Sequence, residues 1–245
     1  MRRPVLLVIA HGSRDPRHAA TVHALVERVR SLRPGLRVET GFLDFNVPSV
    51  HGLLESLAAE GVRDVVALPL LLTRAFHAKA DIPAVLRDAP ARLRIRQAAV
   101  LGPSPLLLSA LERRLYEAGL SPADKSSTGV VLASAGSSDP EAIAVIAGIA
   151  REWWRTGWCA VRPAFASASL PRTEDAVREL RELGCARVAV APYVLAPGFL
   201  PDRIARGAEG ADVLADVLGA APEVARLLLA RYDRARQPAP AALGA

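Results

Sequence analysis

The chain contains one long sequence pattern twice, and this internal duplication limits the folds that it can adopt more than any other feature. The segment VLLVIAHGSRDP at residues 5–16 returns as GVVLASAGSSDP at residues 129–140. EGVRDVVALPLLL at 60–72 returns as LGCARVAVAPYVL at 183–195, and VLGPSPLLLSALERRL at 100–115 is echoed by VLGAAPEVARLLLARY at 217–232. Because the order of segments is kept, we predict two copies of one domain, residues 1–120 and 128–245, joined by a polar linker.

Within the first copy, short apolar runs alternate with longer amphipathic ones. The runs at 4–10, 36–43, 63–70 and 93–100 predict buried strands, and the segments at 15–32, 50–59, 80–87 and 106–116 keep helical spacing. Strands that alternate with helices form a parallel sheet with right-handed crossovers. The second copy follows the same plan, so the predicted fold class is α/β: two tandem doubly wound parallel-sheet lobes with a cleft between them.

Polar side chains follow three of the predicted strands in the first copy. His11 follows the first strand, Asp44 the second, and His77 comes after the third. The carboxyl ends of parallel strands meet at one edge of the sheet, so these three side chains are expected to converge. Two imidazoles and a carboxylate suit a divalent transition metal such as Co²⁺, Fe²⁺ or Zn²⁺, and the same groups accept protons near neutral pH. We therefore predict His11 and His77 as metal-binding and catalytic residues, with Asp44 as a further catalytic residue.

The second copy serves as an internal control for these candidates. Ala135 stands where the first copy has His11, Ser167 where it has Asp44, and Leu200 where it has His77. The framework around these positions is kept. A residue needed only for folding would be expected in both copies, so the sequence predicts one asymmetric site, built by the first copy.

Other polar residues flank the predicted site. Gly12 and Ser13 continue the turn after the first strand, where backbone N–H groups at a helix start can bind an anion. Arg14, Arg74 and Lys79 lie at the same edge and would hold carboxylates by charge-assisted hydrogen bonds; a solvated basic rim is the alternative for each. These five residues are the predicted substrate-binding set. His18, His23 and His51 fall on predicted helices and are expected to be ordinary surface residues.

The balance of charge favours an acidic partner without identifying it. Lys and Arg number 31 against 25 Asp and Glu, and almost all of the cations are arginines. The arginines are scattered and aromatic residues make up only 4%, which argues against a nucleic-acid binder. Neither a P-loop nor a Gly-x-Gly-x-x-Gly motif is present, which disfavours a phosphate-binding hydrolase.

The apolar segments give no sign of export or membrane insertion. The run at residues 5–10 is too short for a signal peptide, which argues against a periplasmic solute-binding protein of two lobes. No stretch reaches the roughly 18 apolar residues of a membrane span, so we expect a cytoplasmic protein without a membrane partner. Cys159 and Cys185 lack a C-x-x-C spacing and are predicted as two reduced core thiols.

Three segments carry a resemblance to a known family. LLVIAHGSRDP, GFLDFNVPS and ALPLLLTRAFHAKADIP are similar to segments of the sirohydrochlorin chelatases, class II chelatases of the CbiX type. The resemblance spans nearly the whole chain. It implies a lyase-type chelatase that inserts Co²⁺ or Fe²⁺ into sirohydrochlorin without ATP, on the way to cobalamin or sirohaem, with the metal as substrate and no permanently bound cofactor.

The resemblance also implies roles for individual residues. His11 and His77 match the family's active-site histidines, and Asp44 falls where relatives often have Glu. The sequence after residue 236 lacks the His-rich tail and the iron–sulfur motif that some members carry. A non-catalytic metal or tetrapyrrole carrier would show the same ligands and remains the alternative. The protein is expected to be a monomer or a homodimer.

Overall fold

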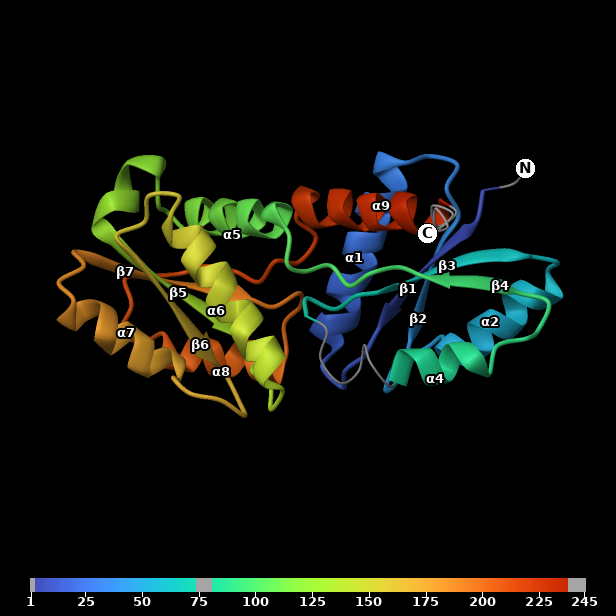
Figure 1. The fold of residues 1–245 in the computed structure, drawn as a ribbon, viewed down its shortest axis with the longest axis horizontal. Coiled ribbons are helices and arrows are strands. Elements are labelled where there is room, and N and C mark those ends of the chain that lie inside the picture. Colours follow the sequence, from blue (N-terminus) through green and yellow to red (C-terminus); the bar gives the residue numbers. More distant parts are fainter. Residues whose placement is uncertain (1–2, 74–80, 238–245) are drawn as a thin grey trace, which may run out of the picture.

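The computed structural model describes residues 3–73 and 81–237, and these form two lobes side by side (Figure 1). Each lobe contains a four-stranded sheet in which every pair of neighbouring strands is parallel. The strand orders are β2-β1-β3-β4 and β6-β5-β7-β8. The two sheets thus have the same topology, which confirms the predicted α/β class and the structural likeness of the two copies.

The first copy contributes the elements β1 (Val5–Ala10), α1 (Pro16–Leu32), β2 (Val38–Phe42), α2 (Val50–Ala59), β3 (Asp64–Pro69), α4 (Asp81–Arg87), β4 (Arg94–Gln97) and α5 (Pro105–Glu117). The second copy, after the 3₁₀ helix η1 (Pro122–Ser127), contributes β5 (Thr128–Ser134), α6 (Pro140–Trp154), β6 (Ala160–Phe165), α7 (Thr173–Glu182), β7 (Arg187–Tyr193), α8 (Phe199–Gly207), β8 (Val213–Leu214) and α9 (Pro222–Arg236). Predicted and observed bounds agree closely except at the last strand of the first copy, which covers 94–97 rather than 93–100. In the described part of the chain no helix is both long and apolar enough to cross a bilayer.

The same local signal starts α1 and its counterpart α6. The carboxylate of Asp15 accepts a hydrogen bond from the backbone N–H of Arg17, and Asp139 does the same for Glu141. A proline follows each aspartate and occupies the first turn, where its missing N–H costs nothing. The repeated Asp-Pro pair therefore fixes the start of the helix that follows the first strand of each sheet.

Successive side chains of the central strands point to opposite faces of each sheet, and the buried apolar residues form three clusters. Leu6 and Val8 of β1 face a cluster that continues into the second sheet through Val130 and Leu132 of β5. The opposite faces pack separately, one under α2 and α4 and the other under α7 and α8. The largest cluster is thus shared by both lobes, and the cores of the two sheets are continuous through it.

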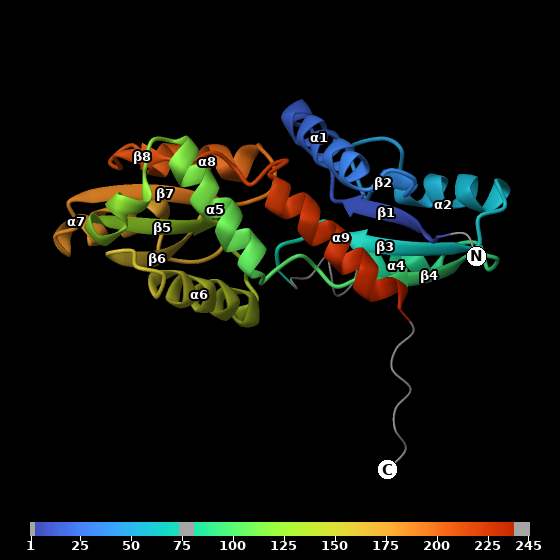
Figure 2. The ribbon, with the colours of Figure 1, turned by 90° about the horizontal axis from the view of Figure 1, so that it is seen from above.

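The closing helix of each copy packs on the sheet of the other copy. Helix α5 contacts β7, whereas α9 contacts α1, β3 and β4 (Figures 1 and 2). Arg33, which follows α1, forms a two-point ion pair with Asp233 of α9, with N–O distances of 2.7 and 2.8 Å. Glu112 of α5 accepts a hydrogen bond of 3.2 Å from the indole of Trp153 on α6. The two lobes of the structure therefore differ from the two sequence copies, because each copy gives its last helix to the lobe that is built by the other copy. Hereafter the first lobe means the β1–β4 sheet with α1, α2, α4 and α9, and the second lobe the β5–β8 sheet with the remaining helices.

Candidate active site

A cavity of about 530 Å³ lies between the lobes, at the carboxyl ends of both sheets. Its wall on the first lobe consists of residues 10–13, His18, Val22 and residues 70–73. The opposite wall consists of residues 134–137, three apolar residues of α6, Phe165 and residues 193–201. Most of these side chains are apolar, so the few polar groups stand out as the ones that orient a ligand.

His11 is held at the cavity by a tightly joined pair of loops. Gly12 has a φ of +96°, and a Cβ at this position would lie only 1.9 Å from the carbonyl oxygen of Asp44. The backbone N–H of Asp44 donates to the carbonyl of His11 at 2.9 Å, and the backbone N–H of Ser13 donates to Oδ1 of Asn46 at 2.8 Å. These contacts explain why glycine follows His11 and why the turns after β1 and β2 form one unit.

Phe45 lies beside the imidazole of His11. The two rings meet edge to face, with centroids 6.3 Å apart. The guanidinium of Arg14 lies over the same phenyl ring, 5.2 Å from its centroid. Phe45 is half exposed and has a φ of 59°, a conformation that is unusual for a bulky residue. It therefore offers an apolar surface next to the cavity between an imidazole and a cation.

His18 is a second imidazole in the cavity wall, and sequence reasoning set it aside. It lies in the first turn of α1, and its Nδ1 is buried without a hydrogen-bond partner among the residues that the structure describes. Burial lowers its pKa below the ordinary value of 6.5, and the nearby positive charge of His11 lowers it further. The imidazole is therefore neutral at pH 7. The sequence signal that could have indicated it is its place near the start of the helix that follows His11.

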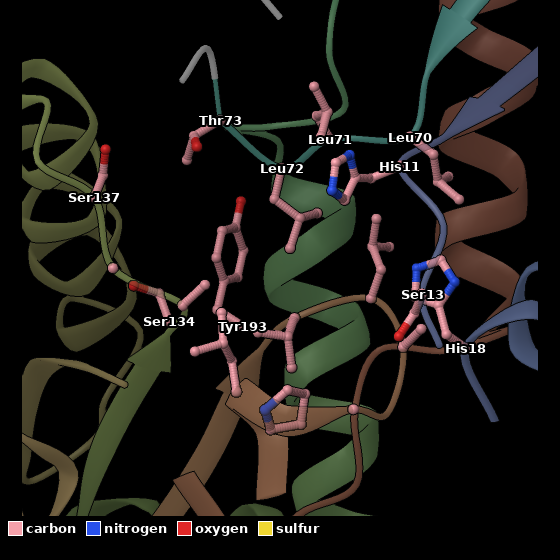
Figure 3. Close-up of a pocket in the computed structure, with 18 of the residues that line it drawn as sticks. His11, Ser13, His18, Leu70, Leu71, Leu72, Thr73, Ser134, Ser137 and Tyr193 are labelled. Atoms are coloured by element: carbon pink, nitrogen blue, oxygen red, sulfur yellow. The ribbon is translucent and has the colours of Figure 1, made fainter. Parts of the chain in front are cut away.

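The second lobe faces the two imidazoles with hydroxyl groups. Figure 3 shows Ser134, Ser137 and Tyr193 on the wall opposite His11 and His18. Tyr193 ends β7 and is only 3% exposed, and its buried hydroxyl has no hydrogen-bond partner in the described part of the chain. Burial raises the pKa of this phenol above its ordinary value, so it remains a proton donor. Sequence reasoning missed Tyr193 because its counterpart in the first copy is a leucine.

The described residues bring together only part of the predicted set. His11, Gly12 and Ser13 line the cavity. Asp44 and Arg14 do not line it; Asp44 is exposed, with one carboxylate oxygen accepting from the backbone N–H of Phe45. The predicted residues Arg74, His77 and Lys79 lie outside the described residues. Within residues 3–73 and 81–237, no three His, Cys, Asp or Glu side chains form a group that could hold a metal ion.

Two like parallel sheets that face one cavity, with imidazoles in one wall, define a two-lobed α/β protein with a ligand-binding cleft between its lobes. The model of the CbiX family matches residues 5–118 and 129–235. The chain therefore belongs to the CbiX family of sirohydrochlorin chelatases. Both copies match, in agreement with the duplication in the sequence.

Individual relatives support the same family. The chain is 30% identical over 206 residues to the sirohydrochlorin cobaltochelatase of Priestia megaterium, which covers 81% of this chain and 66% of that protein. It is 27% identical to the sirohydrochlorin ferrochelatase of Bacillus subtilis, over 83% of this chain and 78% of the relative. The structure of SirB from Bacillus subtilis with Fe³⁺ superposes with a TM-score of 0.81 at 25% identity, covering 96% of both chains. The chain thus spans about two thirds of the first relative and nearly all of the solved structure.

Proposed function

We propose that this protein inserts Co²⁺ or Fe²⁺ into sirohydrochlorin without ATP, for cobalamin or sirohaem synthesis. The observation that carries the proposal is the apolar cavity between the lobes, with His11 and His18 in one wall and hydroxyl groups in the other. A tetrapyrrole has a broad apolar face and a rim of carboxylates, which suits a wide apolar space with polar groups at its edges. The two relatives above are named for cobalt and for iron, so the choice of metal stays open between these ions.

The proposed reaction exchanges one divalent cation for two protons. As M²⁺ enters the ring, two pyrrole N–H groups lose their protons, and the charge of the macrocycle core is balanced. His11, together with His77 as predicted from the sequence, would hold the incoming ion. Weak coordination by a few ligands suits this role, because a closed four-ligand site would retain the metal.

The protons need acceptors near the ring. His18 is suited to this task, since its imidazole is neutral at pH 7 and it lies in the cavity wall. Asp44 is exposed beside the His11 turn and does not line the cavity, so in this proposal it does not touch the ring. In this proposal His18 takes the part that the sequence assigned to Asp44.

The carboxylates of the substrate need cations at the rim. Arg14 is exposed beside Phe45 and is the described cation of the predicted substrate-binding set, whose other cations are Arg74 and Lys79. Charge-assisted hydrogen bonds from these side chains to the substrate carboxylates would fix the orientation of the macrocycle in the cavity. We likewise propose a cytoplasmic monomer or homodimer.

An anaerobic absorbance time course of sirohydrochlorin with Co²⁺, and separately with Fe²⁺, tests the proposal. The wild type should accelerate insertion over the uncatalysed reaction, and His11→Ala should lose most of this acceleration. His51→Ala is the matched control, because His51 is exposed on α2, away from the cavity, and pairs with Glu55 at 3.3 Å. It should keep the wild-type rate.

Two other outcomes would contradict the proposal. If the protein binds the pigment tightly but all rates equal the uncatalysed one, it is a tetrapyrrole carrier. If His11→Ala and His51→Ala retain the same rate as the wild type, insertion takes place but the described cavity is not its site.

A further inference from the structure

The two cysteines of the chain lie together at the end of the second sheet that is opposite the cavity. Cys159 directly precedes β6 and Cys185 lies just before β7, at the amino ends of these strands. Their Sγ atoms are 3.5 Å apart, and both thiols are free. We propose that Cys159 and Cys185 form a reversible disulfide when the protein meets a peroxide. This inference does not depend on the proposed function of the cavity.

The two thiols differ in exposure in a way that suits a stepwise oxidation. Cys159 is exposed, which corrects the expectation that both thiols lie in the core, whereas Cys185 is buried. Burial and the contact with Cys159 raise the pKa of Cys185 to about 11, so it remains a protonated thiol while Cys159 meets the oxidant first. A solvent-accessible thiol with a second cysteine at contact distance is an arrangement found in redox-sensing pairs of a sensor and a resolving cysteine.

The contact exists because of a glycine between the two cysteines. Gly129 on β5 pairs with Ala160, the residue after Cys159. A Cβ on Gly129 would lie 2.8 Å from the Sγ of Cys185 and 3.2 Å from its Cβ. Any larger residue would therefore displace Cys185 or its neighbour Leu180, whose Cδ2 lies 2.9 Å from the same position, and would disturb the contact between the thiols.

The first copy shows that the fold does not require this arrangement. The repeat offsets align Gly129 with Val5, Cys159 with Leu36 and Cys185 with Val62. All three counterparts are ordinary apolar residues that pack in or against the core of the first lobe. The glycine and both thiols thus occur together in one copy only, as expected for a feature with a chemical role.

The proposed chemistry balances with one peroxide. The Cys159 thiolate attacks hydrogen peroxide to give a sulfenic acid, and the oxygen that leaves is released as water. The sulfur of Cys185 then attacks the Cys159 sulfur, the S–S bond forms, and the sulfenic oxygen leaves as a second water. Two thiols are oxidised and one peroxide is reduced. The product links the start of β6 to the start of β7 across β5.

The test uses the full chain, reduced and then freed of reductant, with stoichiometric hydrogen peroxide. Free thiols are counted in denaturant, and the intact mass is recorded. The wild type should lose both thiols together, remain a single chain and lose the mass of two hydrogen atoms. Closure should be at least tenfold slower when the peroxide is added to unfolded protein. The oxidised form should melt several degrees higher than the reduced one, and a thiol reductant should reverse the shift.

Variants separate the role of Cys159, which reacts with the peroxide, from the role of Cys185, which closes the disulfide. Cys185→Ser should stop at a sulfenic acid on Cys159 that a dimedone probe traps, and Cys159→Ser should leave Cys185 reduced. Gly129→Ala keeps both thiols and should slow closure severalfold, with circular dichroism as the check of folding. The proposal is overturned if folded wild type oxidises Cys159 while Cys185 stays titratable, or if closure is no faster in the folded than in the unfolded chain.

Discussion

At the scale of single residues, two residues of the cavity lining carry a buried polar atom without a hydrogen-bond partner among residues 3–73 and 81–237. These atoms are Nδ1 of His18 in one wall and the hydroxyl of Tyr193 in the other. A buried polar group without a hydrogen bond destabilises the folded state by about 1–3 kcal/mol, so such groups are rare unless a ligand completes them. Both residues line the same cavity from opposite walls, so a ligand that enters it comes close to both side chains.

Tyr193→Phe should separate stability from binding. The variant keeps the ring and removes only the orphaned hydroxyl, so the melting temperature should stay the same or rise. Loss of a hydrogen bond to the substrate should raise KM for sirohydrochlorin by roughly fivefold, about 1 kcal/mol, with kcat less affected. Thermal unfolding and steady-state kinetics check both parts; a lower melting temperature with unchanged KM would show a purely structural role.

His18→Leu should show the same separation with a different kinetic signature. Replacing an unpartnered imidazole by an apolar side chain should not lower the free energy of unfolding. The rate of metal insertion should fall by about 10²-fold or more if His18 accepts protons from the ring, since positioned general bases contribute about 10²–10⁴-fold. Urea unfolding and single-turnover insertion are the measurements, with His23→Leu as the control outside the cavity lining. Equal insertion rates in both variants would remove His18 from the reaction.

At the scale of elements, the contact between α5 and α9 joins the two lobes through a buried carboxylate. Glu223 of α9 is only 6% exposed and accepts hydrogen bonds of 2.6 to 3.2 Å from Arg113 of α5. The Arg113 guanidinium holds the pKa of this carboxyl below its ordinary value of 4.5. Because the folded pKa is lowered, the stabilisation is present above pH 4.5 and is lost as the pH falls through the lowered value.

Glu223→Gln should therefore destabilise the protein in a pH-dependent way. At pH 7 the free energy of unfolding should fall by about 1–3 kcal/mol, because a hydrogen bond between charged groups is weakened in a buried position. The difference from wild type should shrink as the pH falls below 4.5. Denaturant unfolding over this range tests it, and Glu209→Gln at an exposed position should show no such trend.

The sequence predicted the helices and strands better than it predicted which of them pack against one another. The strand ends that carry His11 and Asp44 could be located because apolar runs and the polar residues after them are local features. The placement of α5 and α9 could not, since an apolar stripe on a helix fits either sheet equally well. Tyr193 was missed for the same reason, because its role depends on how the second lobe faces the first. His18 was missed although its place near the start of the helix after His11 is a local signal.

At the scale of the whole molecule, one apolar cluster runs through both sheets. Residues on the shared face of the two central strands, such as Val8 and Leu132, belong to this single cluster together with residues of α5 and α9. Cooperative unfolding follows from such continuity, because neither sheet can lose its cover without exposing the core of the other.

Two spectroscopic probes should therefore report the same transition. Trp153, Trp154 and Trp158 are the three tryptophans of the chain and all lie in the second lobe, so their fluorescence reports on that lobe alone. Far-UV circular dichroism reports on both. The two urea curves should have the same midpoint; separate midpoints would show that the lobes unfold independently.

Because α5 and α9 are exchanged between the lobes, each lobe needs a helix from the other sequence copy to complete its core. Between two separate polypeptides, the same crossing of helices would be a domain-swapped dimer, and completing either core would depend on an encounter in solution. A tether makes that encounter intramolecular, at an effective concentration that dilution does not change. It also removes the two-fold symmetry that identical subunits must obey. One half is then free to carry imidazoles and the other hydroxyls. A flat ligand therefore meets two chemically different walls and binds in one preferred orientation.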